Sequence, residues 1–260
     1  MRPIAFFDSG IGGLSVLAAA KAILPSERFV YYGDNARAPY GERDAGEVSA
    51  YTIECVTGLM DRDIKALVLA CNTATSVAVE TLRFRFEIPV ISMEPAIKPA
   101  FEMRKEGRVA VMATPATLRQ PRFLNLLARF DPDHSALLLP CCGLVERIEK
   151  GDFDAPEIEV FVKDLFAPHT GERIDTVVLG CTHFVLIEET VQRVCDRLCP
   201  GARTVHGNEG TVRHLKRVLG QRGLLEESAG PGGVDFVSSG DANRLRDLFD
   251  RIAGAHSRRT

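Results

Sequence analysis

The 260-residue sequence contains no tryptophan, and aromatic residues make up only 7% of it. No apolar run approaches the ~18 residues that span a bilayer. Only four apolar residues separate the opening Met1-Arg2-Pro3 from Asp8, which does not resemble a signal peptide. Basic and acidic residues nearly balance, 32 against 35, so the chain lacks the positive charge of nucleic-acid-binding proteins. These absences favour a cytoplasmic protein with neither a membrane nor a nucleic-acid partner.

The seven cysteines lack the features of a disulfide framework. Their number is odd and no secretory signal accompanies them, so we expect reduced thiols. Cys195 and Cys199 lack a matching His/Cys pair at zinc spacing, and Cys141-Cys142 are adjacent. We expect these four to be small buried hydrophobic residues, and we expect no metal site.

Two other cysteines occupy matched positions. Cys71 lies within the segment Leu67–Thr75 and Cys181 within Val177–His183, and each ends a strand-like run and opens onto a helix-starting sequence. Open α/β sheets bind ligands at the carboxyl ends of their strands, and helix N-termini favour thiolates and anionic groups. A matched pair of thiols suits chemistry that needs an acid on one face of a substrate and a base on the other.

The neighbours of the two thiols differ. Asp8 ends the first expected strand, and His183 is two residues from Cys181. A carboxylate near one thiol and an imidazole near the other are consistent with one acid and one base. Asn72-Thr73 and Thr182 follow the sulfurs and offer donors for carboxylate oxygens.

Short β-type runs alternate with amphipathic helical stretches, which predicts an α/β fold with mostly parallel sheets flanked by helices. The expected strands are Ile4–Phe7, Phe29–Tyr32, Ala66–Ala70, Pro89–Ile91, Val109–Met112, Ala136–Leu139, Thr176–Leu179, Thr204–Val205 and Val234–Val237. The expected helices include Leu14–Leu24, Arg43–Arg62, Thr73–Arg85, Thr117–Phe130, Glu157–Phe166, Phe184–Leu198 and Asn243–Ile252.

The two halves read as weak repeats, since Ile4–Ser9 parallels Val109–Thr114 and a cysteine strand follows each at similar spacing. We expect two similar lobes related by pseudo-two-fold symmetry. Residues 1–92 and 208–260 would form the first lobe, and residues 93–207 the second.

The glycine-rich segment Asp8–Gly13 also partly matches a dinucleotide-binding turn. Ser15 stands where the third glycine is required, although Asp34 lies at a suitable distance for a ribose contact. The Asp8 carboxylate would repel a pyrophosphate, which counts against this interpretation. No P-loop is present, and no lysine lies in a motif that suggests a pyridoxal Schiff base.

Taken together, these motifs resemble those of the glutamate racemases, in the cofactor-independent aspartate/glutamate racemase superfamily. The matching segments are Phe7–Val16, Tyr31–Asp34, Ala38–Gly41, Ala70–Thr75, Glu94–Ala96 and Leu179–His183. Thr-His after the second cysteine is similar to the glutamate branch, because aspartate-type relatives usually carry a glutamate soon after that cysteine.

The resemblance implies two lobes facing each other across a cleft, with Cys71 assisted by Asp8 and Cys181 assisted by His183 on opposite faces of the substrate α-carbon. It implies substrate contacts from Asp8, Ser9, Tyr40, Gly41, Asn72, Thr73, Thr182 and His183, and supporting roles for Asp34, Glu149, Thr114 and Thr117. It also implies a cytoplasmic homodimer that needs no cofactor or metal and supplies D-glutamate for peptidoglycan.

The chain departs from the usual family pattern at Gln120-Pro121, Phe184-Val185 and His206–Gly210, which concern the second lobe. Three alternatives stay open at this point. The protein could be another two-cysteine racemase, such as one acting on aspartate. It could be a non-catalytic nucleotide- or metabolite-binding protein, or a redox sensor that pairs Cys71 with Cys181.

Overall fold

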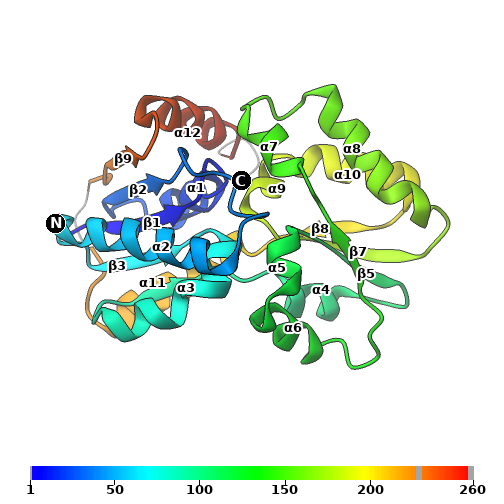
Figure 1. Ribbon diagram of the computed structural model, residues 1–260, viewed down its shortest axis with the longest axis horizontal. Coiled ribbons are helices and arrows are strands. Elements are labelled where there is room, and N and C mark those ends of the chain that lie inside the picture. Colours follow the sequence, from blue (N-terminus) through cyan, green and yellow to red (C-terminus); the bar gives the residue numbers. More distant parts are fainter. Residues whose placement is uncertain (1, 227–229, 257–260) are drawn as a thin grey trace. The chain divides into compact units, whose positions relative to one another are not determined.

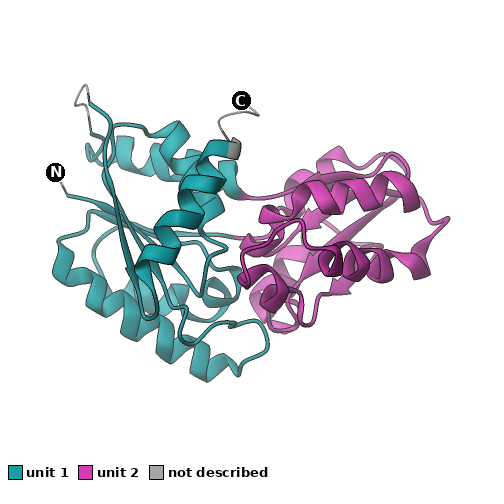
Figure 2. Ribbon diagram, turned by 90° about the horizontal axis from the view of Figure 1, so that it is seen from above, with its two compact units in different colours: residues 1–93, 208–260 teal, residues 94–207 magenta. Residues whose placement is uncertain are grey.

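The chain forms two compact units, coloured separately in Figure 2. Unit 1 comprises residues 1–93 and 208–260, and unit 2 comprises residues 94–207. The computed structural model describes residues 2–226 and 230–256 (Figure 1). The chain passes from unit 1 to unit 2 after Met93 and returns after Gly207.

Unit 1 is built on a parallel five-stranded sheet with the strand order β4-β3-β1-β2-β9. Its strands are β1 (Ile4–Asp8), β2 (Phe29–Gly33), β3 (Ala66–Leu69), β4 (Val90–Ser92) and β9 (Val234–Ser238). The central strands are continuous runs of apolar residues because helices cover both faces of the sheet.

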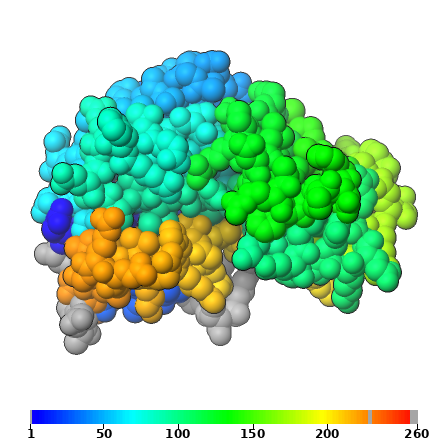
Figure 3. All heavy atoms as spheres, turned by 90° about the horizontal axis from the view of Figure 1, so that it is seen from below, coloured from blue at the N-terminus to red at the C-terminus, as the bar shows by residue number. Residues whose placement is uncertain are grey.

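The helices of unit 1 pack in two groups. They are α1 (Leu14–Ile23), α2 (Ala45–Leu59), the 3₁₀ turn η1 (Met60–Arg62), α3 (Asn72–Arg85), α11 (Asn208–Gln221) and α12 (Ala242–His256). The α2–α3 pair covers the side of the sheet onto which Ala5 and Phe7 project, while α1 packs against α11 and α12. The exposed side of α11 forms part of the surface in Figure 3, where it is orange.

Unit 2 repeats this strand order in a parallel four-stranded sheet, β6-β5-β7-β8. Its strands are β5 (Arg108–Ala113), β6 (Leu137–Pro140), β7 (Ile174–Leu179) and β8 (Arg203–Val205). Here β5 takes the place of β1, β7 that of β3, β6 that of β2 and β8 that of β4. Cys71 after β3 and Cys181 after β7 are therefore topologically equivalent residues.

Helices also cover both faces of the second sheet. They are α4 (Ile97–Met103), α5 (Pro115–Arg119), α6 (Pro121–Ala128), α7 (Leu144–Glu149), α8 (Pro156–Phe166), the 3₁₀ turn η2 (Ala167–His169), α9 (Thr182–Leu186) and α10 (Glu188–Leu198). Side chains of α7, α8, α9 and α10 pack against β5 and β7 in one hydrophobic cluster. Side chains of α4 and α6 pack against other residues of β5 and β7 in a second hydrophobic cluster.

The expected α/β fold is confirmed, but two expected helices are each split in two. The helix expected over Thr117–Phe130 breaks at Gln120, whose backbone is extended (φ −74°, ψ 135°) because it precedes Pro121. The helix expected over Phe184–Leu198 breaks at Ile187 (φ −112°, ψ 19°). Among the described residues, the helices α4, α7 and α11 are additional to those named from the sequence.

None of the helices within the described residues combines the length and apolar character that crossing a bilayer requires.

Candidate active site

Three strand ends meet at the carboxyl edge of the first sheet. Asp8 is the last residue of β1, Asp34 directly follows β2, and Cys71 lies two residues beyond β3. Backbone hydrogen bonds join the three segments: the N–H of Asp34 donates to the carbonyl of Asp8 (3.0 Å) and that of Ala70 to the carbonyl of Phe7 (2.9 Å). The sheet thus brings the first group of expected site residues together.

Cys71 is buried at the N-terminus of α3, with 6% of its surface exposed. It is the N-cap residue, and its Sγ accepts a hydrogen bond from the backbone N–H of Ala74 (3.4 Å). The Ser9 hydroxyl lies 3.5 Å from the same sulfur. Unsatisfied N–H groups and the positive end of the helix dipole stabilise negative charge at this position.

Asn72, the first residue of α3, presents an unused acceptor. The side chain is 6% exposed, yet its Oδ1 has no hydrogen-bond partner among the described residues. Buried polar atoms are normally paired, because an unpaired one loses its hydration without compensation. The Asn72 carbonyl is therefore suited to accept a hydrogen bond from a ligand such as an ammonium group.

The glycine-rich turn after β1 packs against the site residues themselves. The Asp8 Oδ1 accepts from the N–H of Gly10 (2.9 Å). A Cβ atom on Gly13 would lie 2.7 Å from the Cβ of Asp8 and 3.1 Å from that of Ala70. The lack of space for a Cβ atom thus accounts for the glycine at position 13. The Asp8 side chain already occupies one backbone donor of this turn.

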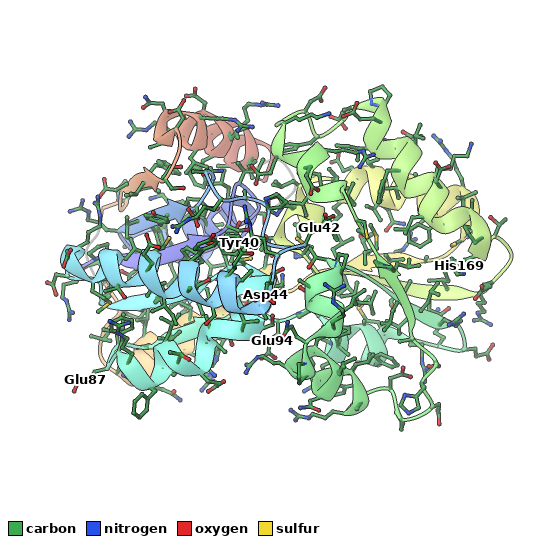
Figure 4. All side chains as sticks on the ribbon, viewed as in Figure 1. Tyr40, Glu42, Asp44, Glu87, Glu94 and His169 are labelled. Atoms are coloured by element: carbon green, nitrogen blue, oxygen red, sulfur yellow. The ribbon has the colours of Figure 1, made fainter. Side chains whose placement is uncertain are left out.

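Tyr40, labelled in Figure 4, is 1% exposed and belongs to the same hydrophobic cluster as Cys71. Its hydroxyl donates a very short hydrogen bond to the Asp34 carboxylate. Burial, and then this hydrogen bond, raise the pKa of Tyr40, so the phenol stays protonated and its proton points to Asp34. A substrate contact from the 40–41 segment would therefore come from the backbone or from the tyrosine ring.

The second sheet places the other expected site residues at its own carboxyl edge. Thr114 directly follows β5, and its hydroxyl lies 3.0 Å from that of Thr117. Cys181 and Thr182 follow β7, the neighbouring strand, and both are buried. A Cβ on Gly180 would lie 2.8 Å from the carbonyl oxygen of Met112, so only glycine lets the two strand ends approach so closely.

His183 connects Cys181 to Glu149 at the end of α7. Its Nδ1 lies 3.7 Å from the Cys181 Sγ, and its Nε2 lies 2.6 Å from the Glu149 Oε1. Burial alone would lower the pKa of His183, but the hydrogen bonds to Cys181 and Glu149 outweigh burial and raise this pKa well above its usual value. His183 thus lies buried between Cys181 and Glu149, with a raised pKa that favours its protonated form.

We expect Glu149→Gln to flatten the dependence of stability on pH. Because the pKa of His183 is higher in the folded protein than in the unfolded chain, protonation of His183 stabilises the fold. This stabilisation is complete below the unfolded-state pKa of about 6.5 and is lost as the pH rises through the folded-state pKa. Glutamine keeps an acceptor but removes the charge, so the pKa of His183 falls and the fold loses about 2 kcal/mol at neutral pH. Chemical denaturation between pH 6 and 9 measures both effects.

Glu157→Gln provides the matched control, because Glu157 pairs with Lys150 on the exposed surface. This control should keep the wild-type slope. An unchanged slope in Glu149→Gln would contradict the charged state assigned to His183.

The two cysteines therefore share a backbone position and differ in their partners. Cys71 contacts a helix N-terminus and Ser9 beside the Asp8 strand end, whereas no side-chain cap forms at Cys181, which contacts His183 instead. Cys141, which follows β6, was expected only as a buried residue and is indeed buried. Burial, and then the neighbouring Cys181, raise the pKa of the Cys141 thiol. The expectation that Cys142 is buried is wrong, because it is exposed.

Arg37 was not among the expected site residues, but it contacts one of them, Asp34. Its Nε contacts both carboxylate oxygens of Asp34 (3.1 and 2.8 Å). Within the described part of the chain, no group of three or more His, Cys, Asp or Glu residues is arranged to hold a metal ion.

Comparison with known proteins places the chain in one family. The model of the Asp/Glu/Hydantoin racemase family matches residues 15–215. A glutamate racemase from Clostridium botulinum is 44% identical over 252 residues, covering 96% of each protein.

Solved structures of glutamate racemases also resemble the chain along nearly its whole length. Glutamate racemase isoform RacE1 from Bacillus anthracis superimposes with a TM-score of 0.85 at 31% identity, covering 97% of this chain and 94% of that one. Glutamate racemase from Francisella tularensis in complex with D-glutamate gives 0.82 at 27% identity, with the same coverage. The resemblance to glutamate racemases is confirmed, and the chain belongs to the Asp/Glu/Hydantoin racemase family.

Proposed function

We propose that this protein interconverts L- and D-glutamate, with Cys71 and Cys181 as the two groups that remove and return the α-proton. The observation that carries this proposal is the pair of equivalent strand-end thiols with chemically different partners. The family membership and the glutamate racemases among its relatives support the choice of reaction and substrate.

Inversion of a stereocentre needs two groups, because a proton leaves one face of the α-carbon and another arrives at the opposite face. One thiolate would remove the α-proton while the other cysteine, as a thiol, would protonate the far side. In the reverse direction the two groups exchange roles. A single base would return the proton to the face it came from and leave the configuration unchanged.

The proton of an amino acid α-carbon is held tightly, so the site must stabilise the carbanion-like state that forms when it leaves. The negative charge spreads onto the α-carboxylate. Donors at the start of α3 and the hydroxyls of Thr73 and Thr182 are suited to bind that carboxylate. The free acceptor of Asn72 and the Asp8 carboxylate are suited to the α-ammonium group.

Each thiol would need a neighbour to balance its proton. Asp8 ends the strand beside Cys71, and His183 contacts Cys181 directly. Glu149 would keep His183 protonated and oriented through its 2.6 Å contact. The proposed substrate-binding groups also include Ser9, Tyr40 and Gly41. The proposed supporting groups also include Asp34, Thr114 and Thr117.

The wild-type protein tests this proposal. When each glutamate enantiomer is incubated with it in D₂O, we expect inversion together with incorporation of deuterium at the α-carbon. Polarimetry measures the inversion, and NMR measures the deuterium. No added cofactor should be needed. Absence of both inversion and exchange with glutamate, combined with turnover of aspartate, would move the assignment to the aspartate branch.

The family resemblance also supports a cytoplasmic homodimer whose D-glutamate enters peptidoglycan synthesis. Sedimentation at several protein concentrations tests the dimer. Rescue of a bacterial strain that requires D-glutamate tests the physiological role, and growth of that strain only with added D-glutamate would contradict it.

A further inference from the structure

The segment between β2 and α2 is held by a polar cluster centred on Arg37, whose side chain is 24% exposed. The Nε atom of Arg37 contacts both oxygens of the fully buried Asp34 carboxylate. Its Nη1 contacts Glu54 (2.9 Å) and its Nη2 contacts the sulfur of Cys55 (3.1 Å). One guanidinium thus ties the start of the segment to two consecutive residues of α2.

Two further contacts hold the same guanidinium and its backbone. The guanidinium carbon lies 4.4 Å from the ring centre of Tyr51, which is also on α2. The backbone carbonyl of Arg37 accepts from the Nε of Arg43 (2.9 Å). The planar fork of arginine satisfies several acceptors at once, which the single ammonium of lysine cannot reproduce.

Asp34 links Arg37 to Tyr40 through hydrogen bonds. One carboxylate oxygen, Oδ2, accepts hydrogen bonds from both Arg37 and the Tyr40 hydroxyl. The Tyr40 ring packs 6.5 Å from Phe7 and 6.2 Å from Tyr51, and it shares a hydrophobic cluster with Cys71. The backbone of Asp34 is meanwhile bonded to that of Asp8.

We propose that Arg37 is a positioning residue of the Cys71 site, which orients Asp34 so that Asp34 anchors Tyr40 and holds the 39–41 segment beside Cys71. The catalytic importance of Arg37 rests on the proposed function, whereas its effect on the surroundings of Cys71 does not. Arg37 itself acts through Asp34 and Tyr40 and is not assigned a contact with substrate.

The buried charge on Asp34 provides a specific test. Arg37→Met leaves this carboxylate without its cation, which is costly for a buried ion pair. We expect kcat/KM for glutamate to fall by roughly 100-fold, the effect of a site group displaced by about 1 Å. In Arg37→Lys, kcat/KM should fall almost as far, because lysine lacks the planar guanidinium group. The double variant Arg37→Met/Asp34→Asn should recover part of the loss, since its buried pair carries no charge and asparagine still accepts from Tyr40.

Arg28→Lys is the matched control, because Arg28 forms an exposed ion pair with Asp235. Arg28 directly precedes β2, at the opposite end of this strand from Asp34. This variant should keep wild-type kinetics. Thermal unfolding of each variant verifies that the protein is folded at the assay temperature.

The alkylation of Cys71 by iodoacetamide, followed by mass spectrometry, tests the proposal without any substrate. In Arg37→Met we expect Cys71 to react severalfold faster and Cys181 to react at the wild-type rate. Wild-type reactivity of Cys71, or an equal increase at both cysteines, would overturn the positioning role. An inactive wild type with selectively altered Cys71 reactivity would instead overturn the proposed function alone.

Discussion

Replacement of either Cys71 or Cys181 by serine should abolish the inversion of glutamate. A serine hydroxyl matches the size of the thiol closely but is far too weakly acidic to act as a base at neutral pH. We expect kcat to fall by about 10³-fold or more, at the upper end of what a general acid or base contributes. Racemisation followed by polarimetry measures this loss for each enantiomer.

Isotope exchange in D₂O distinguishes loss of one base from loss of the whole site. A variant with one remaining cysteine can still remove the α-proton of one enantiomer and return deuterium to the same face. We therefore expect any deuterium incorporated by Cys71→Ser to enter one enantiomer with retention of configuration, and Cys181→Ser to favour the other enantiomer.

Cys142→Ser is the control for these variants, because Cys142 is an exposed cysteine of unit 2 that directly follows the buried Cys141. It should racemise glutamate at the wild-type rate. Unimpaired inversion in Cys71→Ser or Cys181→Ser would falsify the two-base mechanism.

Asp8→Asn and His183→Asn should each slow racemisation by about 10²-fold or more, through opposite half-reactions. Asparagine at position 8 retains an acceptor for the Gly10 N–H and loses only the charge, so the local structure is expected to persist. At position 183 the substitution removes the imidazole that contacts the Cys181 sulfur, the group that would exchange a proton with Cys181 in the proposed mechanism.

The overall rates cannot separate these two effects. The enantiomers have equal free energy in water, so the equilibrium constant is one and kcat/KM must fall equally in both directions. Substrate deuterated at the α-carbon does separate them, because its isotope effect grows only when removal of that deuteron is the slow step.

We expect Asp8→Asn to increase the isotope effect for the enantiomer that Cys71 deprotonates and to decrease it for the other one. His183→Asn should give the reverse pattern. The same enantiomer showing the larger effect in both variants would mean that Asp8 and His183 do not serve separate cysteines.

Most of the strands and the strand-end residues could be predicted because their signals are local. Buried parallel strands are continuous apolar runs, and a polar residue directly after such a run marks the edge where ligands bind. The break at Gln120 also has a local signal, since Pro121 follows it, but the apolar periodicity that continues across the break favours one unbroken helix. In α11, the apolar residues Val212, Leu215 and Leu219 have helical spacing, and Gly207 and Gly210 obscured its start.

Contacts between distant residues could not be predicted in the same way. Arg37 meets Glu54 and Cys55 only because the segment after β2 folds back over α2, and a charged residue in a loop otherwise resembles ordinary surface. The pairing of His183 with Glu149 likewise depends on where α7 ends relative to α9. Only the family resemblance indicated Glu149.

The return of the chain to unit 1 has a consequence for folding during synthesis. Unit 2 is one continuous stretch, so all of its residues leave the ribosome before α11, β9 and α12 do. Until then the outer edge of β2 has no neighbouring strand, because β9 is its partner there. An open strand edge is a site of aggregation, and pairing that waits for distant residues is slow. The unit that begins the chain is therefore the last to be completed, and the edge of β2 needs protection until β9 has been made.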